Sequence, residues 1–424
     1  MNLNVYDAAM ERIEHIFNEF DNVYVSFSGG KDSGVLLNLC LKYLKDNRID
    51  RKLGVLHLDY EAQYDATTRY VEGIYEEYVD YLNIYHVCVP FKVPTATSMF
   101  QSYWRPWEED KQNIWVREMP DYALTKDDFE FYDENMWDYD FQEKISEWIH
   151  QKEQATKTAV LVGIRTQESL HRWRALHKER DTYYDDKKYS KFMFDNIYNI
   201  YPIYDWTTED IWVANAKFGF KYNELYDLYY YAGVPIESMR VASPFISTAQ
   251  DSLKLYKVIE PHTWGKLVSR VNGVNFTGLY GGTTAMGWKS IKKPDNFTWK
   301  EYMEFLLDTL PDDAKENYLA KLETSINFWK EKGGVLSDDT IQELDELGIK
   351  YEIGTHGYKT KKKAVKLDYL DDIDISDFKE IPTYKRMCIC IMKNDHLCKY
   401  MGFSQTKYEM QKRKKAVEKY ANLL

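Results

Sequence analysis

The sequence predicts an α/β fold in which a doubly wound parallel sheet is followed by a mainly helical region. In the first half of the chain, apolar β-branched runs alternate with segments of helical period. Strands that are separated by helices of this length form parallel sheets with right-handed crossovers. A chain of 424 residues has room for two domains and a substantial core. We expect one domain over residues 1–245 and a mainly helical region over residues 246–424.

The elements of the first domain follow from the apolar pattern along the chain. Residues 1–20 read as an amphipathic helix with acidic and basic positions, unlike a signal peptide. Residues 91–141 are rich in Trp, Pro and charged residues and do not continue the alternation of strands and helices. We therefore interpret them as an insertion over the sheet edge. Strands are expected at residues 23–27, 52–58, 84–89, 159–164 and 198–204, and further helices at residues 34–44, 66–82, 142–154 and 207–219.

The first expected strand runs directly into the hexapeptide Ser28-Gly29-Gly30-Lys31-Asp32-Ser33, and a helix follows. Adjacent glycines permit conformations closed to other residues and leave no side chain between backbone and ligand. The free N–H groups at the helix start and the positive end of its dipole favour an anion. The two serines add hydroxyl donors and Lys31 adds a positive charge. A carboxylate beside a phosphate, at Asp32, predicts a bridging Mg²⁺.

Two further positions are expected at the same edge of the sheet. The strand at 159–164 ends in Gly163 and is followed by Arg165, whose guanidinium suits bidentate phosphate or sulfate contacts. Glu168 is expected to hold Arg165 or Arg172 in place, or to contribute to a metal site. Asp59 follows the strand at 52–58, and ligands of such sheets bind beyond the carboxyl ends of the strands.

The run from Tyr201 to Trp212 (Tyr-Pro-Ile-Tyr-Asp-Trp-Thr-Thr-Glu-Asp-Ile-Trp) is expected to be mainly structural. Thr207 is a plausible N-cap with Asp210 at the third helical position, and Trp206 and Trp212 can pack the helix down.

Together these runs resemble the phosphoadenosine phosphosulfate (PAPS) reductase and PP-loop ATP pyrophosphatase superfamily. The spacing of the hexapeptide differs from Walker A, and with Phe27 it is similar to the PAPS reductase branch. The runs 163–169 and 201–212 resemble two later signatures of that superfamily. The resemblance covers about half the chain and implies an adenine nucleotide alpha hydrolase-like fold. It implies ATP or PAPS binding by Phe27, Ser28, Gly29, Gly30, Lys31, Asp32, Ser33, Asp59, Gly163, Arg165, Glu168 and Arg172.

More narrowly, three segments resemble a bacterial and phage-borne group, typified by the immunoglobulin-binding regulator A and often encoded beside a ParB-like partner. They are the insertion with its Trp-x-Pro-Trp run, the segment from Met239 to Phe245, and the run Lys393 to His396. Two departures from the reductases stand out. Their Asp-Thr-Gly motif is replaced by Asp59-Tyr60-Glu61, which leaves Asp59 open to binding ribose, amine or metal. Their late Glu-Cys-Gly-x-His run and the paired cysteines of their iron–sulfur cluster are absent.

A C-terminal cluster of thiols and an imidazole is the most ambiguous part of the sequence. Its members could form a zinc or iron–sulfur site, although their spacing departs from the usual patterns. Packing of the cysteines within a helix, or a redox or sulfur-carrying thiol, stays open. The four residues are Cys388, Cys390, His396 and Cys398.

The leading hypothesis for function is a PP-loop enzyme that cleaves ATP between the α- and β-phosphates with Mg²⁺. Residues 28–33 would hold the β- and γ-phosphates, with Mg²⁺ near Asp32. Lys31 and Arg165 would offset charge that develops on the pentavalent phosphorus. These three residues are the expected catalytic groups, and the products are pyrophosphate and an adenylated acceptor.

Two alternatives stay open. A sulfonucleotide reductase of sulfur metabolism, using thioredoxin, would depend on one of the late cysteines. A regulatory or nucleic-acid-associated module, working with a ParB-like protein, is suggested by the C-terminal tail. Residues 381–424 carry ten Lys and Arg against three Asp and Glu, whereas the whole chain has a net charge of −12.

Composition also bears on where in the cell the protein is expected to act. No run of 18 or more apolar residues exists, so no membrane-spanning segment is expected. Five unevenly spaced cysteines are too few for a disulfide scaffold and favour a reducing cytoplasm. The sequence leaves open whether the chain forms a homodimer.

Overall fold

The computed structural model describes residues 4–168, 183–246, 253–280, 291, 293–354, 362–375 and 381–403. The chain divides into two compact units. The first unit comprises Met1–Val93, Arg105–Pro244 and Leu255–Arg270, and the second comprises Pro94–Trp104, Phe245–Lys254 and Val271–Leu424. The division differs from a single boundary at residue 245, because a short part of the expected insertion belongs to the second unit and residues 255–270 belong to the first.

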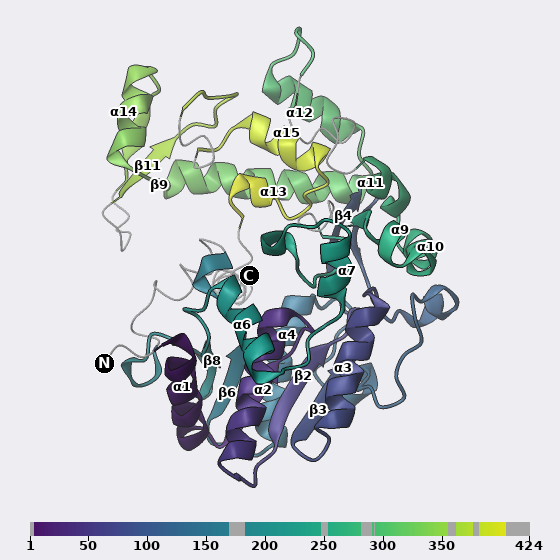
Figure 1. Cartoon of the computed structure of the whole chain (residues 1–424). Helices are drawn as coiled ribbons and strands as arrows, with labels where there is room; N and C mark the ends of the chain where they lie inside the picture. Colours follow the sequence, from purple (N-terminus) through teal and green to yellow (C-terminus); the bar gives the residue numbers. More distant parts are fainter. Residues whose placement is uncertain are drawn as a thin grey trace. The chain divides into compact units, whose positions relative to one another are not determined.

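The first unit is built on a six-stranded sheet with the order β3-β2-β1-β6-β8-β7. All neighbouring strands pair in parallel except β7 and β8, which are antiparallel. Helices α1, α2 and α3 lie in front of the sheet in Figure 1. The doubly wound α/β fold is therefore confirmed. The strands are β1 (Asn22–Ser26), β2 (Leu53–Leu58), β3 (Leu82–Val87), β6 (Thr158–Val162), β7 (Ser190–Phe194) and β8 (Ile197–Ile200).

The edge strand β7 was not predicted from the sequence. It pairs with β8 through a tight hairpin whose two linking residues, Asp195 and Asn196, have positive φ angles of 40° and 61°. Asp and Asn tolerate this conformation better than most residues, and it matches the twist of the flanking strands. The strand contains the apolar run Phe-Met-Phe, but it lies at the sheet edge and only one of its residues, Ser190, is buried.

The helices predicted for the first unit begin and end within five residues of the expected bounds, whereas α7 was not predicted. Thr207 caps α6 in a capping box with Asp210, as predicted. The core lies between the helices and the sheet, where α2 buries twelve of its sixteen residues. The helices are α1 (Val5–Glu19), α2 (Lys31–Asp46), α3 (Asp65–Glu77), α4 (Asp138–Lys152), α6 (Thr208–Phe218), α7 (Leu225–Tyr231), α9 (Tyr256–Ile259) and α10 (Pro261–Arg270), with short 3-10 turns η1 (Glu109–Ile114), η2 (Lys126–Asp128), η3 (Thr166–Glu168), η5 (Tyr184–Asp186) and η6 (Ile236–Ser238).

The second unit is mainly helical, as expected, with two small antiparallel sheets that were not predicted. One sheet has the strand order β10-β11-β9, and the other is the hairpin β4-β5. Their sequences mix apolar residues with Pro, Thr, Gln, Glu and Lys, and lack the continuous apolar runs that mark β1, β2 and β6 as strands. The strands are β4 (Val93–Ser98), β5 (Gln101–Trp104), β9 (Gly334–Leu336), β10 (Tyr351–Ile353) and β11 (Lys363–Leu367). The helices are α11 (Val274–Tyr280), α12 (Trp299–Asp308), α13 (Asp312–Glu331), α14 (Asp338–Glu346), α15 (Tyr384–Met392) and the turn η10 (Lys399–Met401).

Among the described residues, no helix is both long enough and apolar enough to span a bilayer.

Candidate functional site

The glycine loop between β1 and α2 has the conformation expected of an anion cradle. Gly29 has a φ of +73°, and a Cβ there would lie 2.9 Å from the Thr67 side chain, so glycine is required. Gly30 is the N-cap of α2 and offers no side chain to the first-turn N–H groups. The Ser28 hydroxyl accepts from the Gly30 N–H at 3.3 Å and lies 3.1 Å from the Ser33 hydroxyl. The loop is therefore shaped by its own hydroxyls, with backbone N–H groups at the helix start.

Two side chains from a distant segment brace this loop, and sequence reasoning missed both of them. The Lys31 N–H donates to the Tyr226 hydroxyl at 2.9 Å. The Asn223 amide donates to the Gly29 carbonyl oxygen and to the Thr67 hydroxyl, both at 2.9 Å. Asn223 and Tyr226 lie close together around the start of α7. Nothing in their spacing relates them to a loop so much earlier in the chain, so no sequence signal could have found them.

Lys31, Asp32 and Arg165 meet at the carboxyl edge of the sheet. Asp32 Oδ2 accepts from Lys31 Nζ at 2.9 Å, and Asp32 Oδ1 accepts from Arg165 Nε at 2.5 Å. The Arg165 side chain is only 2% exposed. The structure thus places the predicted lysine and arginine in one cluster, with the carboxylate between them.

Arg165 is held by several further groups. Its Nη1 donates to Gln167 Oε1 at 3.3 Å, to the Thr208 hydroxyl at 3.3 Å and to the Trp206 carbonyl oxygen at 3.5 Å. Glu168 Oε1 lies 3.7 Å from Arg165 Nε. This position agrees with the expectation that Glu168 helps to hold Arg165 in place. The run 201–212 therefore also fixes the guanidinium, beyond the packing and capping expected of it. Arg172 lies outside the described residues.

Gly163 explains how β6 comes so close to the loop. A Cβ at this position would lie 2.9 Å from both the Asp32 carbonyl carbon and the Ser33 nitrogen, which are backbone atoms of the first turn of α2. Backbone cannot yield as a flexible side chain can. Glycine at the end of β6 is thus what allows Arg165, two residues on, to reach Asp32.

Replacing Gly163 with Ala is expected to lower the free energy of unfolding by about 1–3 kcal/mol, because the methyl group overpacks against backbone. It should also weaken nucleotide binding by moving α2 away from β6. The matched control is Gly73→Ala in α3, where a Cβ meets nothing within 4 Å. That control should be neutral or gain up to about 1 kcal/mol from helix propensity. Denaturant titration measures both, and equal stabilities for the two variants would contradict the close-packing argument.

Asp59 lies at the expected edge, but its carboxylate is engaged by protein groups. Asp59 Oδ2 accepts from His86 Nε2 at 2.9 Å and from the Arg117 guanidinium, and its backbone oxygen accepts from Trp107 Nε1 at 2.7 Å. Burial opposes ionisation, but Arg117 and His86 outweigh it and hold the pKa of Asp59 below its ordinary value. Burial and the nearby His86 lower the pKa of His57 to about 4. A nucleotide contact by Asp59 stays a prediction.

The structure explains why this chain has Tyr60-Glu61 where the reductases have Thr-Gly. The Glu61 carboxylate accepts from the Trp107 N–H at 2.7 Å and the Val116 N–H at 2.9 Å. It also accepts from Arg270 Nε at 2.8 Å, and both side chains are fully buried. Glu61 therefore ties the insertion to α10.

Phe27 was expected to take part in nucleotide binding. Its ring is buried in the hydrophobic core, so only its backbone can contact a ligand.

The predicted metal site of Cys388, Cys390, His396 and Cys398 is not assembled. Cys388 Sγ donates to the Trp299 carbonyl oxygen at 3.5 Å, and His396 Nε2 lies 3.1 Å from the Ser98 carbonyl oxygen. Positions two apart on α15 point in different directions, so Cys388 and Cys390 cannot converge. Among the described residues, the groups whose donor atoms converge are His57, Asp59 and His86, and Asp65, Glu260 and His262.

The thiols of the chain are all buried. Burial raises the pKa of Cys388 to about 12, and burial with the neighbouring Cys398 raises the pKa of Cys390. A thiol in this state is a poor nucleophile, because the thiolate is the reactive form. The packing interpretation of the C-terminal cysteines is the one that the structure favours.

The geometry also bears on the predicted Mg²⁺ ligand, Asp32. Both carboxylate oxygens of Asp32 already bind cationic side chains, Lys31 and Arg165. A carboxylate held in this way positions two cations for an anion and is a poor fit for a divalent metal ion, whose charge they would oppose. We therefore assign no metal ion to Asp32.

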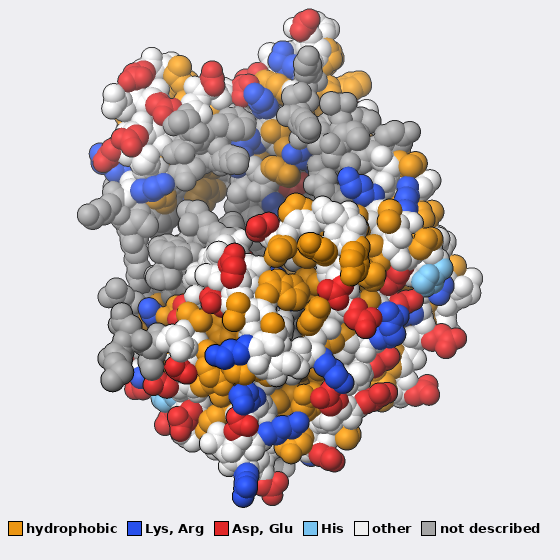
Figure 2. All heavy atoms as spheres, viewed as in Figure 1, with side chains coloured by type: hydrophobic (Ala, Val, Ile, Leu, Met, Phe, Trp, Pro, Cys, Tyr) orange, Lys and Arg blue, Asp and Glu red, His pale blue; other side chains and the backbone are white. Residues whose placement is uncertain are grey.

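The face drawn in Figure 2 adds one observation on charge. Over the described residues of that face, Lys and Arg side chains are interspersed with Asp and Glu. Hydrophobic side chains gather in the region of α7, which includes the exposed Tyr230 and Tyr231. Of the basic stretch 381–424 that suggested nucleic-acid binding, residues 404–424 lie outside the described residues.

Comparison with known proteins adds two sequence matches along the chain. Residues 22–232 match the phosphoadenosine phosphosulfate reductase domain, and residues 233–412 match DUF3440, a domain of unknown function. The uncharacterized protein YbdN of Escherichia coli (strain K12) is 35% identical over 413 residues, covering 96% of this chain and 92% of that protein.

Solved structures resemble the chain more distantly. PAPS reductase from Candida auris, in a phosphate complex, has 15% identity and a TM-score of 0.32, covering 54% of this chain and 93% of that one. FMN adenylyltransferase from Candida glabrata, in complex with ATP, has 17% identity and a TM-score of 0.32, and the match covers 52% of this chain and 57% of that one. The U34-tRNA thiolase NcsA from Methanococcus maripaludis has 12% identity and a TM-score of 0.30, and the match covers 69% of this chain and 91% of that one. These likenesses assign no reaction.

Proposed function

We propose, since the chain belongs to the family of proteins that join a PAPS reductase domain to DUF3440, that it binds ATP at the glycine loop and cleaves it between the α- and β-phosphates. The observation that carries the proposal is the cluster of Lys31, Asp32 and Arg165 beside that loop. Asp32 holds these two cationic side chains next to the N-terminus of α2, and Glu168 lies 3.7 Å from Arg165, so the cationic donors are fixed in position. Such a site suits the oxyanions of a nucleotide.

Each part of the cluster has a separate task in this proposal. The loop N–H groups and serine hydroxyls bind phosphate oxygens, and Lys31 Nζ neutralises the charge that collects on the departing pyrophosphate. The guanidinium of Arg165 is fixed by three neutral acceptors as well as by Asp32. Because it is held before substrate arrives, it stabilises charge at the reacting phosphorus without reorganisation.

The bond changes balance without a protein nucleophile. A lone pair of the acceptor attacks the α-phosphorus, and the bond from that phosphorus to the bridging oxygen breaks. Pyrophosphate leaves with the electron pair, and the acceptor carries the adenylyl group. Mg²⁺ accompanies ATP in reactions of this class through the phosphates themselves, and no side chain of the described residues is assigned to it.

The test is incubation of the full chain with Mg²⁺ and ATP labelled either at the α- or at the γ-phosphate. We expect label from γ-ATP in pyrophosphate and label from α-ATP in AMP or an adenylated acceptor. ADP with inorganic phosphate would contradict cleavage at the α–β bond. A thermal-shift comparison of ATP, PAPS and adenosine 3′,5′-bisphosphate, done in parallel, reports binding without turnover and identifies the preferred nucleotide.

The reductase alternative is less well supported, because every cysteine is buried and two of the late ones have raised pKa values. Single Cys→Ser replacements at positions 388, 390 and 398 discriminate, since a reductase must lose its activity with one of them. The regulatory alternative, with a ParB-like or nucleic-acid partner, and the finer resemblance to the immunoglobulin-binding regulator group stay predictions. The matches to known families and proteins do not bear on them.

A further inference from the structure

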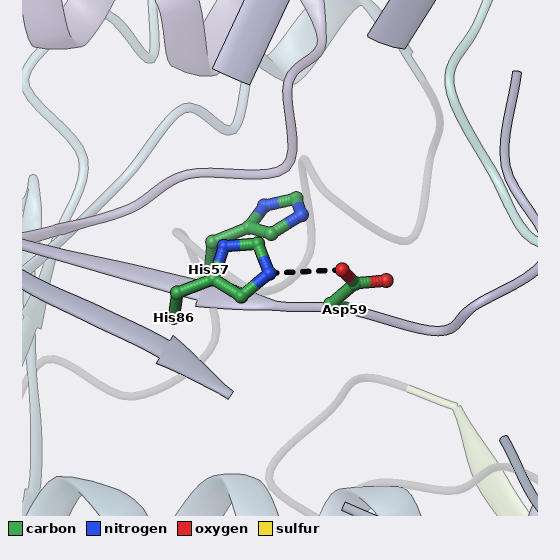
Figure 3. A group of neighbouring side chains, drawn as sticks. All are labelled: His57, Asp59 and His86. Carbon is green, nitrogen blue, oxygen red and sulfur yellow. Dashed lines mark hydrogen bonds and ion pairs between the residues drawn. The ribbon is translucent and has the colours of Figure 1, made fainter. Parts of the chain in front are cut away.

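A second cluster of buried side chains lies at the carboxyl ends of β2 and β3. His57 of β2 and His86 of β3 are direct partners in the parallel register. Asp59 follows His57 by two residues, so both side chains project from the same face of the sheet. Figure 3 shows the two imidazole rings lying side by side, with His86 joined to the Asp59 carboxylate. The proposed function makes no use of these three residues.

The three side chains offer a convergent set of donor atoms. One ligand atom from each lies within 4.8 Å of the other two. The residues are almost fully buried, with exposures of 2%, 0% and 2% for His57, Asp59 and His86. Two imidazole nitrogens and one carboxylate form a ligand set that suits first-row divalent transition metals, whereas Mg²⁺ prefers oxygen ligands only. The composition of the cluster is therefore specific for a class of ion.

Outer contacts orient the imidazoles for this role. His57 Nδ1 lies 2.7 Å from the Phe27 carbonyl oxygen, which can only accept, so Nδ1 carries the hydrogen and Nε2 keeps its lone pair. His86 Nε2 donates to Asp59 in the metal-free chain, so metal binding at Nε2 requires the hydrogen to be on Nδ1 instead. His86 Nδ1 lies 3.4 Å from the Tyr75 hydroxyl, which can accept from Nδ1–H in that tautomer. Metal-bound histidines commonly use their second nitrogen in this way. The contact to Phe27 also links the cluster to the residue that precedes the glycine loop.

Arg117 is the group that competes with a metal ion. Its guanidinium contacts Asp59 Oδ2, the same oxygen that His86 Nε2 approaches. A carboxylate with no exposure requires a compensating cation, and Arg117 supplies it. Within the described part of the chain, the buried Nε of Arg117 has no hydrogen-bond partner, and its side chain is 13% exposed. The guanidinium is thus incompletely bonded and borders solvent.

We propose that His57, Asp59 and His86 form a binding site for a first-row divalent transition metal ion of the zinc class, and that Arg117 fills the cation position when the metal is absent. Binding moves the guanidinium off Asp59 and joins β2 to β3 through the metal. The site is independent of Mg²⁺ and of the phosphates at the glycine loop, so it stands or falls separately from the proposed ATP cleavage.

The test is calorimetric titration of the metal-depleted full chain with ZnCl₂, with MgCl₂ as the comparison. We expect one equivalent of Zn²⁺ to bind and to raise the melting temperature, with no heat from Mg²⁺. His57→Gln and His86→Gln should each lose this equivalent. Arg117→Gln should bind Zn²⁺ at least about tenfold more tightly, because a like charge is removed beside the metal.

Two controls keep the result interpretable. His262→Gln alters the other convergent group, Asp65, Glu260 and His262, and should retain the full equivalent. If a histidine variant fails to fold, Co²⁺ added to the unaltered chain should give the visible absorption of a site with nitrogen ligands. The proposal is overturned if the unaltered chain binds no Zn²⁺, if His262→Gln abolishes binding, or if Arg117→Gln weakens it.

Discussion

Arg165→Met is expected to lower the rate of pyrophosphate release from ATP by about 10²- to 10³-fold, the usual effect of removing one preorganised donor from a developing charge. Arg165 is 2% exposed and held by Asp32, Gln167 and Thr208. Methionine has nearly the same length without charge, so the change removes the guanidinium and leaves most of the volume. The measurement is single-turnover release of labelled pyrophosphate at saturating ATP.

Arg165→Lys separates charge from geometry, because lysine keeps the charge but cannot reproduce the planar set of donors. We expect it to recover only a small part of the rate. The matched control is Arg51→Met. Arg51 is partly buried and donates to the Phe17 carbonyl oxygen at 3.1 Å, on the amino side of β2 and away from the loop. A rate for Arg165→Met within a few fold of the unaltered chain, in a folded protein, would remove Arg165 from the reaction.

Glu61→Ala is expected to cost about 3–5 kcal/mol of stability, because it breaks a buried ion pair by removing one partner. The Arg270 side chain is 1% exposed and would lose the carboxylate at 2.8 Å that neutralises it. Two backbone N–H groups of the insertion, at Trp107 and Val116, would lose their acceptor as well. Glu108, 3.8 Å from Arg270 Nη1, replaces only part of the lost charge. Denaturant unfolding of the full chain measures the loss.

The comparison for this variant is Asp46→Ala, which breaks the exposed i,i+4 pair with Lys42. An exposed pair contributes less than about 1 kcal/mol. The double variant Glu61→Leu with Arg270→Met should regain part of the stability, since no unpaired charge is left in the interior. Similar losses for Glu61→Ala and Asp46→Ala would show that Glu61 does not organise the insertion.

Local patterns in the sequence predicted much of the first unit. The strand, glycine turn and helix around residues 23–44 can be predicted from residues that are neighbours in the sequence, and so can the capping box at Thr207. The presence of Lys31 and Arg165 in one cluster could be inferred because carboxyl ends of parallel strands share one edge. In each of these cases, residues close together in the chain determine the structure, or a general rule of sheet topology does.

The features that the sequence did not reveal depend on contacts between distant segments. Asn223 and Tyr226 brace the glycine loop, and Glu61 binds the insertion and Arg270, without any local pattern that records the pairing. The C-terminal cysteines show the reverse case. Their closeness in sequence suggested a metal site, but helical geometry turns Cys388 and Cys390 apart.

The position of β1 in the sheet has a consequence for synthesis of the chain. One neighbour, β2, follows soon after, but the other, β6, pairs Asn22 with Thr158, which is 136 residues further along. At ~5–20 residues per second, a ribosome needs on the order of ten seconds to produce that partner. Until then the nascent chain carries an unpaired apolar strand edge, a template for association with other chains. Non-local pairing of this kind also slows folding.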